Sequence, residues 1–305
     1  MLTQEQLKYL DQNAYKIRTM ALSMITHSRW GHIGGSFSLA EVLAVLYGYH
    51  IKIAPDGKGP DRVVLSKAHC SPALYATLCL VGTIPEEMLS KYCMLDGLDG
   101  HLERLQYPGI ETSGGSLGIG LSTAVGMALA FRIKGQTSGR VYCILGDGEL
   151  QEGQNWEAMM AAAQYRLDNL TLIIDYNKVQ AKGFLYEEIG LEPLVEKIRS
   201  FGIELTECDG HDLSDIDKAL SFAHNKARTG HPSCVIAHTV KGKGVEECEF
   251  NCAWHTHPPT PAQARRFLNE LAQRYGYEPA ELDGALRDEH DNTLQAGMEV
   301  EHVTL

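Results

Sequence analysis

The sequence predicts an α/β fold, a doubly wound and mostly parallel sheet flanked by helices. Short apolar runs that stop at turn residues alternate along the chain with longer segments of helical spacing, which is the pattern of βα units. The content of 44% hydrophobic and 22% charged residues is ordinary for a globular protein. At 305 residues the chain can bury a sizeable core. We therefore expect one domain over residues 1–275, followed by an acidic and weakly patterned tail over residues 276–305.

Five short runs predict the strands of this sheet. Most of them carry Val, Ile or Leu at successive positions and stop at polar turn residues, as buried parallel strands do. The predicted strands are residues 63–66, 141–145, 170–174, 203–208 and 233–238.

Apolar residues at helical spacing predict the helices, beginning with one or two helices over residues 3–29. Ser38 is predicted to be an N-cap, with Glu41 placed for a capping box, so a helix is expected over residues 38–49. The glycine-rich residues 31–36 before it are predicted to form a loop. The remaining predicted helices are residues 72–81, 120–130, 153–165, 190–201, 214–228 and 261–275.

Two polar side chains follow neighbouring predicted strands. Asp147 lies on the turn Gly-Asp-Gly after the second strand, and Asn177 follows the third. If these strands are parallel, with the helix between them as crossover, both side chains emerge at the carboxyl edge, where open α/β sheets bind ligands. Carboxylate, amide and carbonyl oxygens suit Mg²⁺ held jointly with a diphosphate, and Gly148 lets a backbone N–H approach a phosphate closely. The Gly-Asp-Gly turn by itself is more typical of a surface turn that caps helices, and it is the full spacing to Asn177 that favours a ligand site.

Several loops carry a histidine, including His32, His69 and His101. Each of them, seen alone, is also an ordinary loop residue. The loop at residues 112–120 is not a P-loop, because no Gly-Lys-Ser/Thr follows, and it lacks the third glycine of the dinucleotide fingerprint.

Composition excludes several classes of function. The net charge is -12 and Lys and Arg form no basic stripe, so a nucleic-acid partner is not expected. No run approaches the roughly 18 apolar residues of a membrane span, and the N-terminus lacks the order of a signal peptide. Eight scattered cysteines, several inside apolar runs, favour a reducing cytoplasm. We expect a cytoplasmic protein without a membrane partner.

Eight motifs in order resemble the N-terminal, diphosphate-binding domain of transketolases, from about residue 13 to 270. GDGELQEGQNWEA with the later Asn177 is similar to the thiamine-diphosphate motif in its transketolase version. The others are GHIGGSFSLAEVLAVLY, DRVVLSKAHCSPALYA, GHLE, TSGGSLGIGLSTAVGMALA, DYNKVQ, CDGHD, and IAHTVKGKGV followed by WH.

The resemblance implies thiamine diphosphate and Mg²⁺ as cofactors, with Ca²⁺ or Mn²⁺ as possible substitutes for the metal. The metal ligands would be two side chains and one backbone carbonyl. The histidines would face the thiazolium ring and the donor sugar, where imidazole can donate, accept and shuttle protons. The implied residues are Asp147, Asn177 and Val179 for the metal, His69, Gly115, Leu117, Gly148, Asn177 and His255 for the cofactor, and His32, His69, His101 and His255 for catalysis.

A partner chain is also implied. In the family, a glutamate at the place of Glu152 lies near the subunit interface and interacts with a catalytic glutamate of the pyrimidine-binding domain. Glu152 could equally be an acid that is favoured near the start of a helix by the helix dipole. This sequence stops before that domain. The resemblance therefore implies the N-terminal subunit of a split transketolase, in an α2β2 assembly with a separate C-terminal subunit. The pair would transfer a two-carbon ketol unit from a ketose or ketose phosphate to an aldose or aldose phosphate.

Three alternatives remain open from the sequence. One is the corresponding half of a 1-deoxyxylulose-5-phosphate synthase or of a 2-oxo-acid dehydrogenase, and another is a relative that binds cofactor without catalysis. The third is a zinc-binding interaction protein, because Cys248, Cys252, His255 and His257 lie within ten residues. Their spacing lacks the long spacer of zinc fingers.

Overall fold

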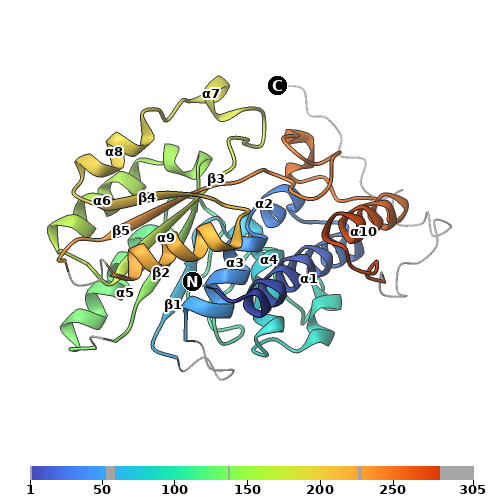
Figure 1. Ribbon diagram of the computed structural model, residues 1–305, viewed down its shortest axis with the longest axis horizontal. Coiled ribbons are helices and arrows are strands. Elements are labelled where there is room, and N and C mark those ends of the chain that lie inside the picture. The colour runs from blue at the N-terminus through green and yellow to red at the C-terminus, as the bar shows by residue number, and fades with distance from the viewer. Residues whose placement is uncertain (1, 53–58, 137, 226–228, 282–305) are drawn as a thin grey trace.

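The computed structural model describes residues 2–52, 59–136, 138–225 and 229–281, and it confirms the predicted sheet (Figure 1). Five parallel strands lie in the order β1-β2-β3-β5-β4. The change of direction along this order is typical of doubly wound sheets. The strands are β1 (Arg62–Leu65), β2 (Val141–Gly146), β3 (Leu170–Tyr176), β4 (Glu204–Asp209) and β5 (Ser233–His238).

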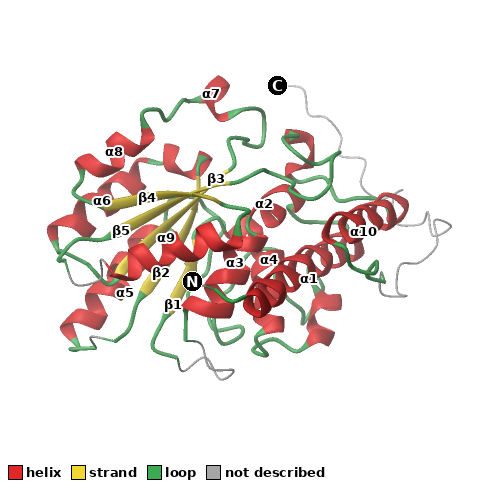
Figure 2. Cartoon of the chain, viewed as in Figure 1, coloured by secondary structure: helices red, strands yellow, loops and turns green. Residues whose placement is uncertain are grey.

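Helices cover both faces of the sheet (Figure 2). One face packs against α1 (Gln4–Ser28), α3 (Ala40–Val45), α4 (Ser71–Leu80) and α9 (Leu213–Asn225). The other face packs against α5 (Gly120–Ile133), α6 (Gly153–Gln164) and α8 (Leu194–Ser200). Successive strand residues serve opposite faces: Val63 and Leu65 lie in the first core, and Val64 lies in the second. This double burial explains why the strands are apolar throughout.

A third apolar cluster joins the far side of α1 to α10 (Pro261–Tyr275) and to α2 (Ile33–Ser38). Arg18 of α1 forms a buried ion pair with Glu41 of α3 at 2.6 Å, and the hydroxyl of Tyr275 in α10 donates to the same carboxylate at 2.7 Å. Within the described residues no helix is both long enough and apolar enough to cross a membrane.

The structure also contains short helical segments. They connect the main elements and carry several of the polar residues at the carboxyl edge. They are η1 (Leu46–His50), η2 (Ala68–Cys70), η3 (Glu86–Lys91), η4 (Gly148–Gln151), α7 (Leu185–Glu188) and η5 (Cys252–His255).

The predicted loop at residues 31–36 is wrong, because residues 33–38 form helix α2. Ser38 ends α2 and does not cap the next helix, whose N-cap is Leu39. The Ser38 hydroxyl is buried and donates to the Asp175 carboxylate at 2.6 Å. The Ser38 side chain thus bonds to a distant strand residue and not, as predicted, to the backbone of the helix that follows it. The predicted helix over residues 190–201 starts later, at Leu194, and α7 was not predicted.

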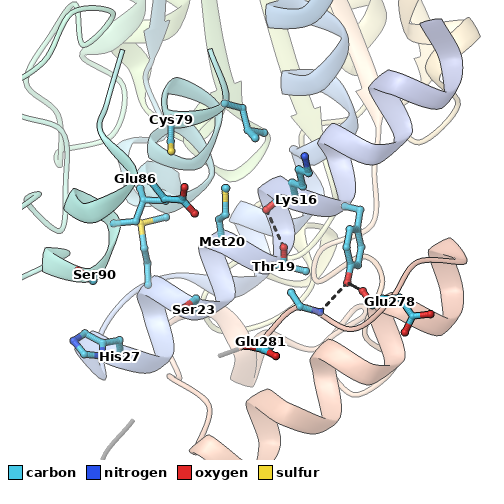
Figure 3. Close-up of a pocket in the computed structure, with 15 residues that line it drawn as sticks. Lys16, Thr19, Met20, Ser23, His27, Cys79, Glu86, Ser90, Glu278 and Glu281 are labelled. Carbon is cyan, nitrogen blue, oxygen red and sulfur yellow. Dashed lines mark hydrogen bonds between the residues drawn. The ribbon is translucent and has the colours of Figure 1, made fainter. Parts of the chain in front are cut away.

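The first residues of the predicted tail pack against α1. The hydroxyl of Tyr15 donates to the carbonyl oxygen of Glu278 at 2.7 Å and accepts from the N–H of Ala280 at 3.2 Å. A hollow of about 570 Å³ lies between α1, the region of η3 and residues 278–281 (Figure 3). The rest of the tail, from residue 282, and residues 226–228 of the predicted helix 214–228 lie outside the described residues.

Candidate functional site

The carboxyl edge of the sheet holds a cavity of about 270 Å³. Gly146 at the end of β2 pairs with Asp175 in β3, and the N–H of Asp147 donates to the carbonyl of Asp175 at 3.2 Å. Asp147 and Asn177 therefore emerge side by side, as the parallel register requires. With one exception, every site residue implied by the sequence lines this cavity, namely His32, His69, His101, Gly115, Leu117, Asp147, Gly148, Asn177, Val179 and His255.

Three residues that carry the implied oxygen ligands, Asp147, Asn177 and Val179, line the cavity. The Asp147 carboxylate accepts the N–H of Gly148 at 2.7 Å, and the side-chain oxygen of Asn177 accepts the N–H of Val179 at 3.1 Å. The amide nitrogen of Asn177 donates to Asp175 at 3.0 Å, which fixes the orientation of the amide. Burial and the nearby charge of Asp175 raise the pKa of Asp147 to about 6. A buried carboxylate beside an amide and a carbonyl oxygen is the hard donor set that fits Mg²⁺.

Two buried lysines, which the sequence reasoning did not single out, also line the cavity. The Lys67 ammonium is paired with the Asp175 carboxylate. The Lys241 ammonium donates to the carbonyl of Val179 at 2.9 Å and lies 2.8 Å from Nδ1 of His255. Burial and the neighbouring Lys67 lower the pKa of Lys241 to about 8. Two ammonium groups facing one small cavity fit a bound anion such as a diphosphate.

Four histidines from distant parts of the chain form one cluster. The ring centroid of His32 lies 5.1 Å from His69, 5.2 Å from His255 and 5.8 Å from His101. Burial lowers the pKa of His32 to about 4 and of His255 to about 3, and it lowers that of His69 well below its usual value. At neutral pH these imidazoles are uncharged, so each offers one donor and one acceptor to a polar ligand.

One nitrogen of this cluster lacks a partner. Nδ1 of His32 is buried and makes no hydrogen bond within the described part of the chain, and neither does the side-chain nitrogen of Gln180, another cavity residue. Buried polar atoms are normally hydrogen-bonded. The two orphan atoms therefore support a cavity built for a polar ligand.

A glycine loop closes the cavity on the side of η4. Gly115 and Gly118 have positive φ angles of 152° and 86°, which favour glycine. The buried carboxylate of Glu149 accepts the N–H of Gly118 at 2.8 Å and the N–H of Gly146 at 3.0 Å. Sequence reasoning missed Glu149, although a carboxylate two residues after Asp147 was a visible signal.

Glu152 is the one implied site residue that does not line the cavity. It is exposed at the start of α6, and its side chain makes no capping hydrogen bond. A Cβ added to Gly118 would lie 2.7 Å from the Cβ of Glu152, so the two residues are in close contact. Glu152 is thus available to a group outside the described chain, and its role stays a prediction.

The zinc-site hypothesis finds no support. Across the described residues, no three His, Cys, Asp or Glu side chains gather as a metal site would require. Cys248 is buried in the third apolar cluster. The ring of His257 packs edge-on against Trp254, with a centroid distance of 5.2 Å.

Comparison with known proteins gives a consistent result. Residues 10–301 match the family model described as transketolase, thiamine diphosphate binding domain. A 6-deoxy-6-sulfo-D-fructose transketolase subunit of a Clostridium species is 42% identical, over 88% of this chain and 98% of that protein. An apulose-4-phosphate transketolase subunit of Phocaeicola vulgatus is 36% identical, over 88% of this chain and 96% of that protein. The structure of transketolase from Campylobacter jejuni matches with a TM-score of 0.81 and 30% identity, over 92% of this chain and 44% of that one.

Proposed function

Because this chain belongs to the transketolase family, whose members are transferases, we propose that it is the thiamine-diphosphate-binding subunit of a split transketolase. The observation that carries the proposal is the cavity at the carboxyl edge, which combines hard oxygen donors, two buried lysines and a cluster of neutral histidines. The match to two transketolase subunits over nearly their whole length, against 44% of a single-chain transketolase, supports the split arrangement. The same family match favours transketolase over the synthase and dehydrogenase alternatives.

The cavity would hold the diphosphate and Mg²⁺ at one end of the cofactor and the aminopyrimidine ring at the other. Asp147, Asn177 and the carbonyl of Val179 would ligate Mg²⁺, while Lys67 and Lys241 would neutralise the diphosphate. Gly148 would donate its backbone N–H to a phosphate oxygen. At the other end, Gly115 and Leu117 would border the aminopyrimidine ring. These roles agree with the donor set, the charges and the close approach that the cavity offers.

The reaction would transfer a two-carbon ketol unit from a ketose or ketose phosphate to an aldose or aldose phosphate. When bound, thiamine diphosphate supplies the electron sink that cleavage of the carbon–carbon bond requires. His32, His69, His101 and His255 would orient the donor through its carbonyl and hydroxyl oxygens and would hold or move protons at those oxygens. Their depressed pKa values keep them neutral, so they can act as donors or acceptors near neutral pH.

A second subunit would complete the site. We propose a separate C-terminal chain, in an α2β2 assembly, that contributes a pyrimidine-binding domain and a catalytic glutamate. Glu152 would lie at this contact, since it is exposed beside the glycine loop that borders the cavity.

The experiment is a reconstitution. The chain is purified alone and with the C-terminal subunit that co-purifies with it from its native source. Both samples receive Mg²⁺, thiamine diphosphate, a ketose donor and an aldose acceptor, and pyruvate replaces the donor in a parallel assay. We expect ketol transfer only from the pair and no decarboxylation of pyruvate. Turnover by the chain alone would contradict the split arrangement, and a pair that binds cofactor without turnover would contradict the enzymatic role.

A further inference from the structure

A large aromatic side chain is held exposed beside the histidine cluster. Trp30 is 41% exposed, although indole rings are mostly buried in folded proteins. It lies two residues after the end of α1, and neither the cavity at the carboxyl edge nor the three apolar clusters include it. Its position therefore needs a reason other than core packing.

The backbone around Trp30 is fixed. The Ser28 hydroxyl accepts the N–H of Trp30 at 3.3 Å and donates to its carbonyl oxygen at 2.8 Å. Arg29 has a left-handed φ of 55°, and Gly31 has a φ of 138°. A Cβ on Gly31 would meet the Ile25 side chain at 2.8 Å, so only glycine fits this turn. The hydrogen bonds of Ser28 and the geometry of this turn therefore hold the indole ring in its exposed position.

The ring lies edge-on against two histidines of the cluster. Its centroid is 5.3 Å from His32 and 5.4 Å from His101. On another side it covers Gly100, where an added Cβ would lie 2.5 Å from the indole. The absence of a side chain at Gly100 lets the ring lie against the backbone. Trp30 therefore extends the wall of the histidine cluster outward.

Beyond this wall lies an open hollow of about 650 Å³. His101 lines both the hollow and the cofactor cavity, so the two spaces meet at its ring. The charged residues of the hollow are Asp99 and Glu103, and among the described residues that line it there is no Lys or Arg. Carboxylates accept hydrogen bonds from hydroxyl groups and repel anions, while an indole face offers contact to carbon–hydrogen surface.

We propose that Trp30 is a specificity-determining residue, whose ring forms the wall against which the carbon chain of the ketose lies beyond His101. The sugar hydroxyls on this side point to Asp99 and Glu103. A terminal anionic group does not bind in the hollow and is held by cations outside it. This inference rests on the proposed function, because it places a ketose at the histidine cluster.

The test compares Trp30→Ala and Trp30→Phe with Tyr165→Ala. Tyr165 is a matched control, since it is an aromatic residue that is 52% exposed and lies before β3, at the opposite edge of the sheet. In the reconstituted enzyme, with D-fructose 6-phosphate as donor, Trp30→Ala should raise the donor KM on the order of tenfold with little change in kcat. Trp30→Phe should retain most of the affinity, and the control should behave as wild type. The dissociation constant of thiamine diphosphate should be the same in all four proteins.

Fluorescence gives a readout that does not require turnover. The chain has three tryptophans, of which Trp254 is 4% exposed and Trp156 is partly buried. Adding D-fructose 6-phosphate to the cofactor-loaded complex should change the emission of the wild type and not that of Trp30→Phe.

The outcomes separate the two proposals. A wild-type complex that binds no thiamine diphosphate would overturn the proposed function and this inference with it. A wild-type complex with ketol transfer, and a Trp30→Ala variant with unchanged donor KM, would overturn this inference alone. A fall in kcat without a change in KM would also overturn it, because the ring would then only position the histidines. Weaker association of Trp30→Ala with the second subunit, at unchanged donor KM, would instead assign Trp30 to the contact between subunits.

Discussion

The Glu149 carboxylate accepts the backbone N–H of Gly118 at 2.8 Å and thereby ties the turn that carries Asp147 to the glycine loop at residues 112–120. It also accepts the N–H of Gly146 at 3.0 Å and the hydroxyl of Ser66. Glu149 is 2% exposed, so water cannot replace these bonds. One buried acid thus fixes two walls of the cavity relative to each other.

Removing this carboxylate should destabilise the fold. Glu149→Ala leaves three buried donors without an acceptor, and each unsatisfied group costs on the order of 1 kcal/mol or more. We expect a loss of about 3 kcal/mol in the free energy of unfolding, measured by urea titration of the isolated chain. Glu152→Ala is the control, because this exposed acid of the same segment should change the value by less than about 0.5 kcal/mol. Equal stability of the two variants would refute the role of Glu149.

The proposed Mg²⁺ site gives a second prediction. Asp147→Asn removes the only carboxylate among the three proposed ligands, so Mg²⁺-dependent binding of thiamine diphosphate should weaken by about 100-fold or more. Isothermal titration with and without EDTA measures this difference in the reconstituted complex. In EDTA, the variant and the wild type should bind equally weakly.

Asp209→Asn is the matched control for Asp147→Asn. Asp209 also ends a parallel strand at the carboxyl edge, but it lies outside the cavity and accepts the N–H of His211. This variant should bind cofactor as the wild type does. If Asp147→Asn binds equally well, the metal ligands have been assigned incorrectly.

The sheet and the position of Asp147 beside Asn177 could be predicted from sequence because both follow from local pattern. Apolar runs define the strands, and parallel register brings their carboxyl ends to one edge. Glu152 illustrates the limit, since its suggested role concerns a contact with a second chain. The family resemblance supplied that role, and the geometry of one chain does not test it.

Helix α2 could not be predicted because its glycines serve tertiary packing. A Cβ on Gly35 would lie 2.6 Å from the sulfur of Cys70, and one on Gly34 would lie 2.9 Å from the Lys241 side chain. Helix propensity treats such glycines as breakers, whereas here close contact decides. Lys67 was passed over for a related reason: lysines are usually exposed, and its partner Asp175 is 108 residues away in sequence.

Acid should weaken the junction between α1 and α10. Burial alone would raise the pKa of Glu41, but Arg18 and His211 hold it well below its usual value of 4.5. The folded state therefore binds the proton more weakly than the unfolded state. The contribution of Glu41 to stability is fully present above about pH 4.5 and is lost as the pH falls toward the depressed pKa.

Glu41→Gln tests this pH dependence. At pH 7 the variant leaves the buried charge of Arg18 unpaired and should lose about 3 kcal/mol or more of unfolding free energy. As the pH is lowered from 5 to 3, the difference from the wild type should narrow in urea titrations. Glu157→Gln, at an exposed position of α6, should follow the wild type at every pH. A constant difference across the range would contradict the assignment.

Two glycines near α5 should respond in opposite directions to the same substitution. Gly118→Ala adds a Cβ at a φ of 86° and only 2.7 Å from the Cβ of Glu152. It should cost about 1–3 kcal/mol of unfolding free energy through backbone strain and displacement of α6.

Gly126→Ala changes an exposed position inside α5, where an added Cβ meets nothing within 4 Å. It should stabilise the chain by about 0.4–1 kcal/mol, because it reduces the entropy of the unfolded state. Thermal unfolding of the isolated chain measures both changes, and a Gly118→Ala variant as stable as the wild type would show that the left-handed turn at Gly118 is not maintained in solution. In the reconstituted enzyme, Gly118→Ala should also lower kcat if Glu152 meets the second subunit, whereas Gly126→Ala should leave the rate unchanged.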